Sequence, residues 1–516
     1  MAGPVGPWRS ALCWVALVPL IYGLTQMDRD GNVLRPWRAA VLGYGCGVLF
    51  FFGNCFWIYQ TMYLYGGLPK PVAFGIVILF SLYLGLYYGL FALLFAVIRR
   101  SKLGLGGALV SVPFVWVAVE LARARVTGFP WDLLGNAQVD NLLVTRIAPV
   151  AGVMGISFVV AAVNAGVAGF FVGGKRRFVL AAVALTVALG LEFGGGLGVL
   201  RDAGRETLTH SAVMVQENLE VGAVGKQVKP LSQSEEMEQF SALSLHPQVH
   251  GVDGWSGGSL GPEVSVIVWP EAPSHFQTND PSFVAGVGAL AREARVPVIS
   301  GSLGVDMDAR AGRGYYLYDS ASLFDATGSF GGRYDKIHLV PWGEYVPFKR
   351  FFSFAEKLTE GVGDMDAGHE RGVFRAGGHA YGVFVCYESI FGNEVREFVK
   401  NGAEVLVNIS DDGWYGDTGA PWQHLNMARM RAIENHRWVV RSTNTGITTA
   451  IDPRGRVGVE APRHVRGSYA IGFGFENGMT TYTRFGDWWA WVCVVVALGL
   501  VGWSFASANE AHLNRR

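Results

Sequence analysis

The sequence predicts an α-helical membrane bundle joined to one soluble α/β domain, and two observations lead to this fold class. Half of the 516 residues are hydrophobic and only 16% are charged, which favours membrane helices over a string of soluble domains. The apolar residues also cluster in the first 200 residues and near the C-terminus. We therefore expect a transmembrane helical domain over residues 1–201, a soluble domain over 202–485, and a C-terminal transmembrane helix with a short tail over 486–516.

Apolar runs in the N-terminal region predict the individual membrane spans. A helix needs ~20 residues to cross ~30 Å of hydrocarbon. The expected spans are residues 11–25, 39–62, 71–98, 104–122, 147–172, 178–200 and, near the C-terminus, 488–505. The first run is short and contains Pro19. It could be a signal sequence, but it lacks a strongly basic start and a small-residue cleavage site, so we interpret it as a span.

Basic residues in the loops predict the orientation of the spans. Arginine and lysine residues follow the first, third and fifth apolar runs. These alternate loops lie on one side, and the positive-inside rule makes that side cytoplasmic. The chain then leaves the sixth span on the opposite face. The soluble domain is therefore expected outside the cytoplasm, and the C-terminal Arg515 and Arg516 inside it.

The soluble region alternates short apolar runs with helical stretches. Predicted strands are residues 211–215, 264–269, 296–300, 320–324, 381–385, 404–409 and 448–451, and predicted helices are 281–294 and 422–436. Several of the strand runs are continuously apolar, which is typical of sheets that are covered on both faces. The pattern predicts a layered α/β sandwich.

Charge and motif content narrow the function classes. Acidic and basic residues balance at 42 each, so no net field attracts nucleic acid. His338 and His424 have no partners at metal-ligand spacing, and no nucleotide-binding glycine loop is apparent. We therefore expect no metal, no cofactor and no nucleic-acid partner.

Cys386 is the only one of five cysteines outside the apolar runs that predict spans. It follows the predicted strand 381–385, where the chain turns polar at Tyr387 and Glu388. A thiol at such a strand end can be presented to a substrate as a nucleophile. The alternative is a small core residue.

Glu271 and Lys336 also lie where predicted strands end or polar turns begin. Pro270 stops the strand before Glu271, and Lys336 follows Tyr334-Asp335. Together with a thiol these residue types make chemical sense, because a carboxylate can accept the thiol proton and a lysine can stabilise a thiolate or an oxyanion. The product would be a covalent acyl-enzyme that then transfers its acyl group. Spacing alone does not bring the three residues together, and each could be an ordinary turn or surface residue.

The order of these motifs carries a family resemblance. Trp269-Pro270-Glu271, then Tyr334-Asp335-Lys336, then Cys386-Tyr387-Glu388 resemble the carbon-nitrogen hydrolase (nitrilase) superfamily. With spans in front and one behind, the whole chain resembles the apolipoprotein N-acyltransferase family. Further similar stretches are residues 127–131, 413–416, 421–424 and 441–446.

The resemblance implies a nitrilase-like α-β-β-α sandwich and a role for each motif residue. Glu271 matches the general base, Lys336 the charge-stabilising lysine, and Cys386 the nucleophile that forms a thioester. Residues expected to support the site or shape its pocket are Glu344, Tyr387, Glu388, Trp342 and Trp414.

The resemblance also implies the reaction and its setting. A fatty acyl group would move from a membrane phospholipid, typically phosphatidylethanolamine, to the α-amino group of the diacylglyceryl-modified cysteine of an apolipoprotein. The enzyme would lie in the bacterial inner membrane, with its catalytic domain on the periplasmic side. Separately from the resemblance, we expect a monomer, and the sequence itself leaves the oligomeric state open. Asp319 and Asp411 depart from the family pattern, which often has asparagine at both positions, so hydrogen bonding there is expected to differ. Residues 338–370 are a candidate lid.

Two other functions remain open at this stage. A membrane-anchored amidase or nitrile-type hydrolase would use the same three residues with water as acceptor, but one anchor would suffice for it. A transporter or receptor would carry buried ionisable residues in its spans, and only Glu120 and Glu192 are candidates. Both enzyme functions require Cys386, whereas a binding protein would tolerate Cys386→Ala.

Overall fold

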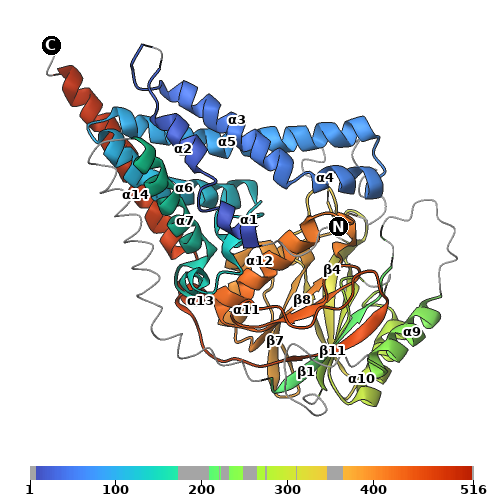
Figure 1. The fold of residues 1–516 in the computed structure, drawn as a ribbon. Coiled ribbons are helices and arrows are strands. Elements are labelled where there is room, and N and C mark those ends of the chain that lie inside the picture. The colour runs from blue at the N-terminus through green and yellow to red at the C-terminus, as the bar shows by residue number, and fades with distance from the viewer. Residues whose placement is uncertain are drawn as a thin grey trace. The chain divides into compact units, whose positions relative to one another are not determined.

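The computed structural model describes residues 7–28, 30–172, 208–219, 221, 232–247, 264–272, 276–309, 311–345 and 364–513. The chain forms two compact units, which we call the helical unit (1–59, 70–204 and 485–516) and the sandwich unit (60–69 and 205–484). Figure 1 shows the elements of both. Residues 60–69, which the sequence assigns to the transmembrane domain, cluster with the sandwich unit.

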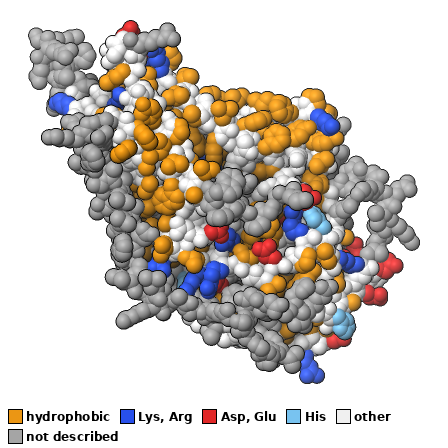
Figure 2. All heavy atoms as spheres, viewed as in Figure 1, with side chains coloured by type: hydrophobic (Ala, Val, Ile, Leu, Met, Phe, Trp, Pro, Cys, Tyr) orange, Lys and Arg blue, Asp and Glu red, His pale blue; other side chains and the backbone are white. Residues whose placement is uncertain are grey.

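The helical unit contains the long apolar helices. Four described helical segments are long and apolar enough to cross a membrane, and a bent fifth is formed by α3 and α4 with the π-helical turn η1, which clusters with the sandwich unit. Their bounds are α3 Pro36–Asn54, α4 Trp57–Gln60, η1 Thr61–Tyr65, α5 Lys70–Arg100, α6 Gly104–Ala122, α7 Ala148–Val172 and α14 Trp488–Leu513. Large hydrophobic side chains are exposed on α3 and α5, including Leu49 and Leu79, and Figure 2 shows such side chains gathered over these helices. These faces fit contact with lipid.

Small residues explain the close packing of α3 on α5. A Cβ atom added to Gly43 would lie 2.5 Å from the Cβ of Ala92, and one added to Gly47 would lie 2.7 Å from that of Tyr88. Only glycine allows these backbones to approach so closely, as is common between membrane helices.

The predicted span 11–25 does not form one continuous helix. Helix α1 ends at Leu12, and α2 occupies only Val18–Thr25. Pro19 lies in the first turn of α2, where its missing N–H is harmless, but inside a longer helix it would break the hydrogen-bond ladder. Asn164 of α7 satisfies the broken backbone, because its side chain accepts from the Leu17 N–H at 2.8 Å and donates to the Cys13 carbonyl at 2.9 Å. The predicted span 178–200 lies outside the described residues.

The sandwich unit contains two sheets. The six-stranded sheet has the order β11-β1-β2-β3-β4-β5, and the five-stranded sheet has the order β10-β9-β8-β7-β6. Strand bounds are β1 His210–Gln216, β2 Val264–Val268, β3 Val298–Met307, β4 Tyr315–Phe324, β5 Phe330–Asp335, β6 Phe374–Ala376, β7 His379–Val385, β8 Val405–Ser410, β9 Val439–Thr443, β10 Thr449–Ile451 and β11 Gly467–Phe473.

Alternating side chains assign each face of the sheets to a layer. In β1, Ala212 and Met214 join a core with Val383 and Val385 of β7, whereas Val213 points to the opposite face. That outer face is covered by α9 Gln233–Leu245 and α10 Pro281–Ala294. Helices α11 Gly392–Lys400 and α12 Ala420–Asn435 cover the five-stranded sheet. The unit is therefore the expected α-β-β-α sandwich (Figure 1).

Candidate active site

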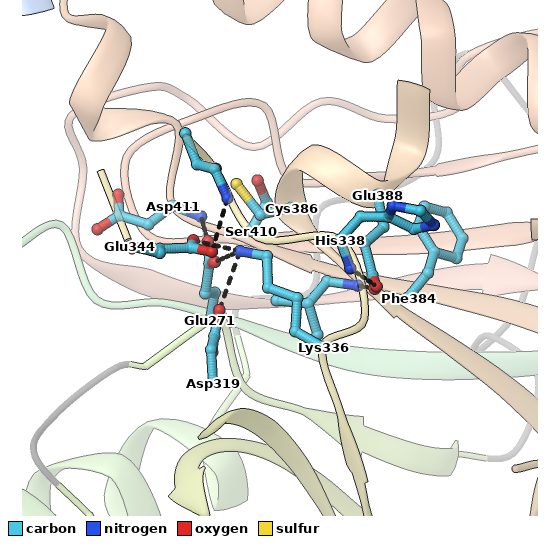
Figure 3. Close-up of polar contacts among 12 residues, drawn as sticks. Glu271, Asp319, Lys336, His338, Glu344, Phe384, Cys386, Glu388, Ser410 and Asp411 are labelled. Carbon is cyan, nitrogen blue, oxygen red and sulfur yellow. Dashed lines mark hydrogen bonds and ion pairs between the residues drawn. The ribbon is translucent and has the colours of Figure 1, made fainter. Parts of the chain in front are cut away.

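The carboxyl ends of several strands deliver the predicted site residues. β2 runs through Val268 to Trp269 and Pro270, and Glu271 follows. β5 ends at Asp335, directly before Lys336, and β7 ends at Val385, directly before Cys386. Although these residues are far apart in sequence, Figure 3 shows their side chains converging. The structure thus brings together the three residues that spacing alone could not connect.

Lys336 lies at the centre of a buried group of acids, which we call the Lys336 cluster (Glu271, Asp319, Lys336 and Glu344). Its Nζ donates to Glu271 Oε1 at 2.8 Å, Asp319 Oδ2 at 3.0 Å and Glu344 Oε1 at 2.5 Å. Burial alone would lower the pKa of Lys336, but these three carboxylates hold it well above its ordinary value. Lys336 is therefore a fixed cation.

Oxygens of the three acids lie within 4.8 Å of one another, a spacing that also suits a metal ion. Here the Lys336 ammonium group already contacts all three and supplies the positive charge. Burial raises the pKa of Asp319 to about 8, and it also raises the pKa of Glu344. The cluster thus holds more carboxyl groups than its single cation can neutralise.

Backbone donors orient two of the acids. Glu271 Oε2 accepts from the N–H of Asp411, just beyond β8, at 2.7 Å. Glu344 Oε2 accepts from the N–H of Val340 at 2.9 Å. Each of these carboxylates therefore has one oxygen on Lys336 and the other on the backbone, which fixes its direction.

Cys386 has an unusual backbone conformation. Its φ is +46°, in the left-handed region that non-glycine residues rarely adopt, and it begins the 3-10 turn η6 Cys386–Ile390. Burial raises the pKa of its thiol well above the usual range, the charges of Glu271 and Asp412 add to this, and Lys336 and Ser410 oppose it. The thiol is therefore protonated at neutral pH and needs a base during nucleophilic attack.

Glu388 connects the end of β7 to the segment that carries Lys336. Its Oε2 accepts from the Val385 N–H at 2.7 Å. Its Oε1 accepts from the Tyr334 hydroxyl at 2.7 Å and from the N–H groups of Ile337 at 2.8 Å and His338 at 3.1 Å. One buried carboxylate therefore holds the backbone on either side of the site in register.

A second buried group lies behind Cys386, and we call it the Asp412 cluster (Ser410, Asp412, His424 and Arg441). His424 Nε2 is 2.9 Å from the Cys386 carbonyl oxygen, and its Nδ1 is 2.8 Å from Asp412 Oδ1. Arg441 donates to Asp412 Oδ2 at 2.7 Å, and Ser410 donates to Asp412 Oδ1 at 2.9 Å. Sequence reasoning missed this cluster, although His424 and Arg441 lie in two stretches that resemble the family, residues 421–424 and 441–446.

The remaining predicted site residues lie around these clusters. Tyr387 is buried, and its ring meets that of Phe391 edge to face at 5.4 Å. Trp342, with φ +66°, donates its N–H to the Tyr345 carbonyl at 2.8 Å. The Trp414 carbonyl accepts from Thr61 at 2.9 Å. Of the candidate lid 338–370, residues 346–363 lie outside the described residues.

Two family models match this chain, one over the helical region and one over the sandwich. Residues 260–470 match the carbon-nitrogen hydrolase family, and residues 4–166 match the apolipoprotein N-acyltransferase N-terminal domain. Among solved structures, a carbon-nitrogen hydrolase from Helicobacter pylori G27 is 17% identical, with a TM-score of 0.35, over 51% of this chain and 88% of that one. Saccharomyces cerevisiae Nit3 is 14% identical, with a TM-score of 0.37, over 55% and 96%.

Full-length relatives are more similar. The apolipoprotein N-acyltransferase of Geobacter metallireducens is 33% identical over 98% of this chain and 93% of its own length. That of Methylococcus capsulatus is 32% identical over 95% of this chain and 93% of its own. With such identity across both its apolar helices and its sandwich, this chain belongs to the apolipoprotein N-acyltransferase family.

Proposed function

We propose that this protein transfers a fatty acyl group from a membrane phospholipid, through a thioester on Cys386, to the N-terminal α-amino group of the diacylglyceryl-cysteine of apolipoproteins. Family membership supports the coarser statement, an acyltransferase of lipoprotein biosynthesis. The observation that carries the finer one is the buried contact of Lys336 with Glu271 at 2.8 Å, near Cys386, whose backbone has a φ of +46° at a strand end (Figure 3).

In the first half of the proposed reaction, Glu271 accepts the Cys386 thiol proton while sulfur attacks the ester carbonyl of the phospholipid. Lys336 stabilises the oxyanion of the tetrahedral intermediate. The ester C–O bond then breaks, the lysophospholipid leaves as an alcohol with the proton from Glu271, and the acyl group stays on sulfur.

In the second half, the lipoprotein α-amine attacks the thioester. Glu271 accepts a proton from the attacking nitrogen, Lys336 again faces the oxyanion, and the C–S bond breaks. The thiol is regenerated by the proton held on Glu271. The site side chains Glu271, Lys336 and Cys386 are each at most 7% exposed, and limited access of water favours transfer to the amine over hydrolysis.

The chemistry suits an enzyme held at a membrane. Both proposed substrates are lipids, and the helical unit presents apolar faces of α3 and α5. The basic loops support a periplasmic position for the sandwich unit in the bacterial inner membrane. We propose that the protein acts there as a monomer and requires no metal or cofactor, since the steps above use only side chains.

Intact-protein mass spectrometry tests the thioester directly. The purified protein is incubated with phosphatidylethanolamine, beside Cys386→Ala and beside Cys46→Ala, which removes a half-buried thiol of α3. We expect one fatty acyl mass on the wild type and on Cys46→Ala, released by hydroxylamine, and none on Cys386→Ala.

Two results would count against the proposal. An adduct that persists in Cys386→Ala would exclude this thiol as the acyl carrier. A wild type that stays unmodified although it cleaves the phospholipid ester would favour a hydrolase that uses water.

A further inference from the structure

The charge count of the Lys336 cluster does not balance. Lys336 Nζ meets three carboxyl groups at 2.5 to 3.0 Å. Glu271, Asp319 and Glu344 are 7%, 2% and 9% exposed, and Lys336 is fully buried. Three ionised acids around one cation would leave two uncompensated negative charges, which is costly for buried side chains. One of the three acids is therefore expected to hold a proton.

The hydrogen bonds indicate which acid this is. Both oxygens of Glu271 accept from nitrogen donors, and so do both oxygens of Glu344. Such bonds stabilise the ionised form of a carboxyl group. Asp319 differs, because Oδ2 accepts from Lys336 while the buried Oδ1 has no donor among the described residues. Oδ1 is therefore the atom on which a proton costs least.

A proton on Asp319 also lies beside a carboxylate. Oxygens of Asp319 and Glu271 lie within 4.8 Å of each other, so a neutral Asp319 avoids repulsion between two like charges at this short range. Since Glu271 already has two nitrogen donors, the proton belongs to Asp319. Burial, followed by the charge of Glu271, raises the pKa of Asp319 to about 8, in the same direction.

We propose that Asp319 is a positioning residue that works as a neutral acid, holding Lys336 and Glu271 in place without adding a second excess negative charge beside Cys386. This inference rests on the proposed roles of Glu271 and Cys386. It gives the aspartate of β4 the hydrogen-bonding character of an amide, with one oxygen that accepts and one group that donates.

The proposal has a defined pH dependence. The ionisable groups facing Asp319 or its partners are Lys336 after β5, Glu271 after β2, Glu344, Asp411 after β8 and Cys386 after β7. When Asp319 loses its proton, the site gains one negative charge, which raises the pKa of the thiol further and lowers its thiolate fraction. Wild-type thiol reactivity should therefore rise less steeply at alkaline pH than that of a variant with a neutral side chain at position 319.

Alkylation of Cys386 by iodoacetamide measures this effect without lipid. Rates are followed by mass spectrometry from about pH 6 to about pH 10 for the wild type and Asp319→Asn. The ratio of variant to wild-type rate should increase about tenfold from the acid to the alkaline end. Asp306→Asn, which removes an exposed carboxylate of β3, should give a ratio that does not change with pH.

A ratio for Asp319→Asn that is constant and well above one would overturn the proposal, because Asp319 would then be ionised throughout the range. A constant ratio near one would mean that Asp319 stays neutral up to about pH 10, which supports the proposal. A second variant, Asp319→Ala, deletes the contact to Lys336 and should slow phospholipid-dependent thioester formation more than Asp319→Asn at neutral pH. Equal losses in the two would also overturn it. Failure of the proposed function is distinguishable, since it appears as acyl transfer that survives Cys386→Ala.

Discussion

Two buried clusters of charged side chains flank Cys386. They differ in net charge and in how far their side chains are exposed to solvent. The Asp412 cluster pairs one acid with Arg441, and its charged side chains are completely buried. The Lys336 cluster sets three acids against one cation, and two of those acids retain slight exposure. The charge-balanced, fully buried Asp412 cluster is suited to fixing the position of the backbone. The Lys336 cluster has an excess of acids and slight exposure, which suits it to proton transfer.

The pKa of an aspartate shifts in opposite directions in the two clusters. Burial alone would raise the pKa of Asp412, but Arg441 and His424 hold it far below its ordinary value. The pKa of Asp319 rises to about 8, because burial outweighs the attraction of Lys336 and Glu271 adds repulsion. Aspartate thus serves as a permanent anion behind Cys386 and as a titrating group beside it.

Of the variants that test this difference between the clusters, Lys336→Met should slow thioester formation most. It removes the only cation of the Lys336 cluster and leaves three acids that repel one another. We expect single-turnover thioester formation from phospholipid to fall by about 10³-fold. Lys336→Arg should recover little of the rate, because a planar guanidinium does not fit three carboxyl groups arranged around one nitrogen. A loss below tenfold would show that the cation has no part in the chemistry.

The sequence predicts the helices and strands of the sandwich well where capping residues and the apolar pattern agree. Helix α10 was predicted with its observed bounds, since Asp280 caps it and Pro281 begins it. Strand β9 was missed because Arg441, Ser442 and Thr443 look polar, although all three are buried in the sheet. Their burial depends on partners in distant segments, which no local pattern reports.

The site was predictable only in part for the same reason. Each of Glu271, Lys336 and Cys386 could be recognised at a strand end, but their convergence required the family resemblance. The Asp412 cluster was not recognised, because residues 412, 424 and 441 come from a turn, a helix and a strand. Asp319 was noted as a departure from the family, and only its contact with Lys336 at 3.0 Å indicates what that departure does.

His424→Ala should have an intermediate effect, because it acts through the backbone of Cys386. The ring nitrogen that contacts the Cys386 carbonyl is lost, so the left-handed backbone at Cys386 is held less firmly and its thiol direction is less well fixed. Thioester formation should slow on the order of 10-fold to 10²-fold. His424→Gln, which retains an N–H donor, should recover part of this rate.

His464→Ala provides the matched control, since His464 contacts Asp417 at an exposed position. It should leave thioester formation and thermal unfolding as in the wild type. If His424→Ala instead lowered the unfolding temperature without slowing the chemistry of the folded protein, the Asp412 cluster would serve stability alone.

Ser410→Ala should change the reactivity of Cys386 least. It tests whether a residue of the Asp412 cluster also acts on the thiol. Ser410 donates to Asp412, and its hydroxyl is one of the groups that oppose the rise in the pKa of Cys386. Removing the hydroxyl leaves Asp412 its contacts with His424 and Arg441, so the fold should persist. The thiol pKa should rise, and iodoacetamide alkylation below that pKa should slow about threefold. Ser302→Ala, which removes a buried hydroxyl of β3 bonded to Ser322, should not change the alkylation rate. A loss as large as that of His424→Ala would mean that Ser410 positions Cys386 as strongly as the ring does, and the division between the two groups would no longer hold.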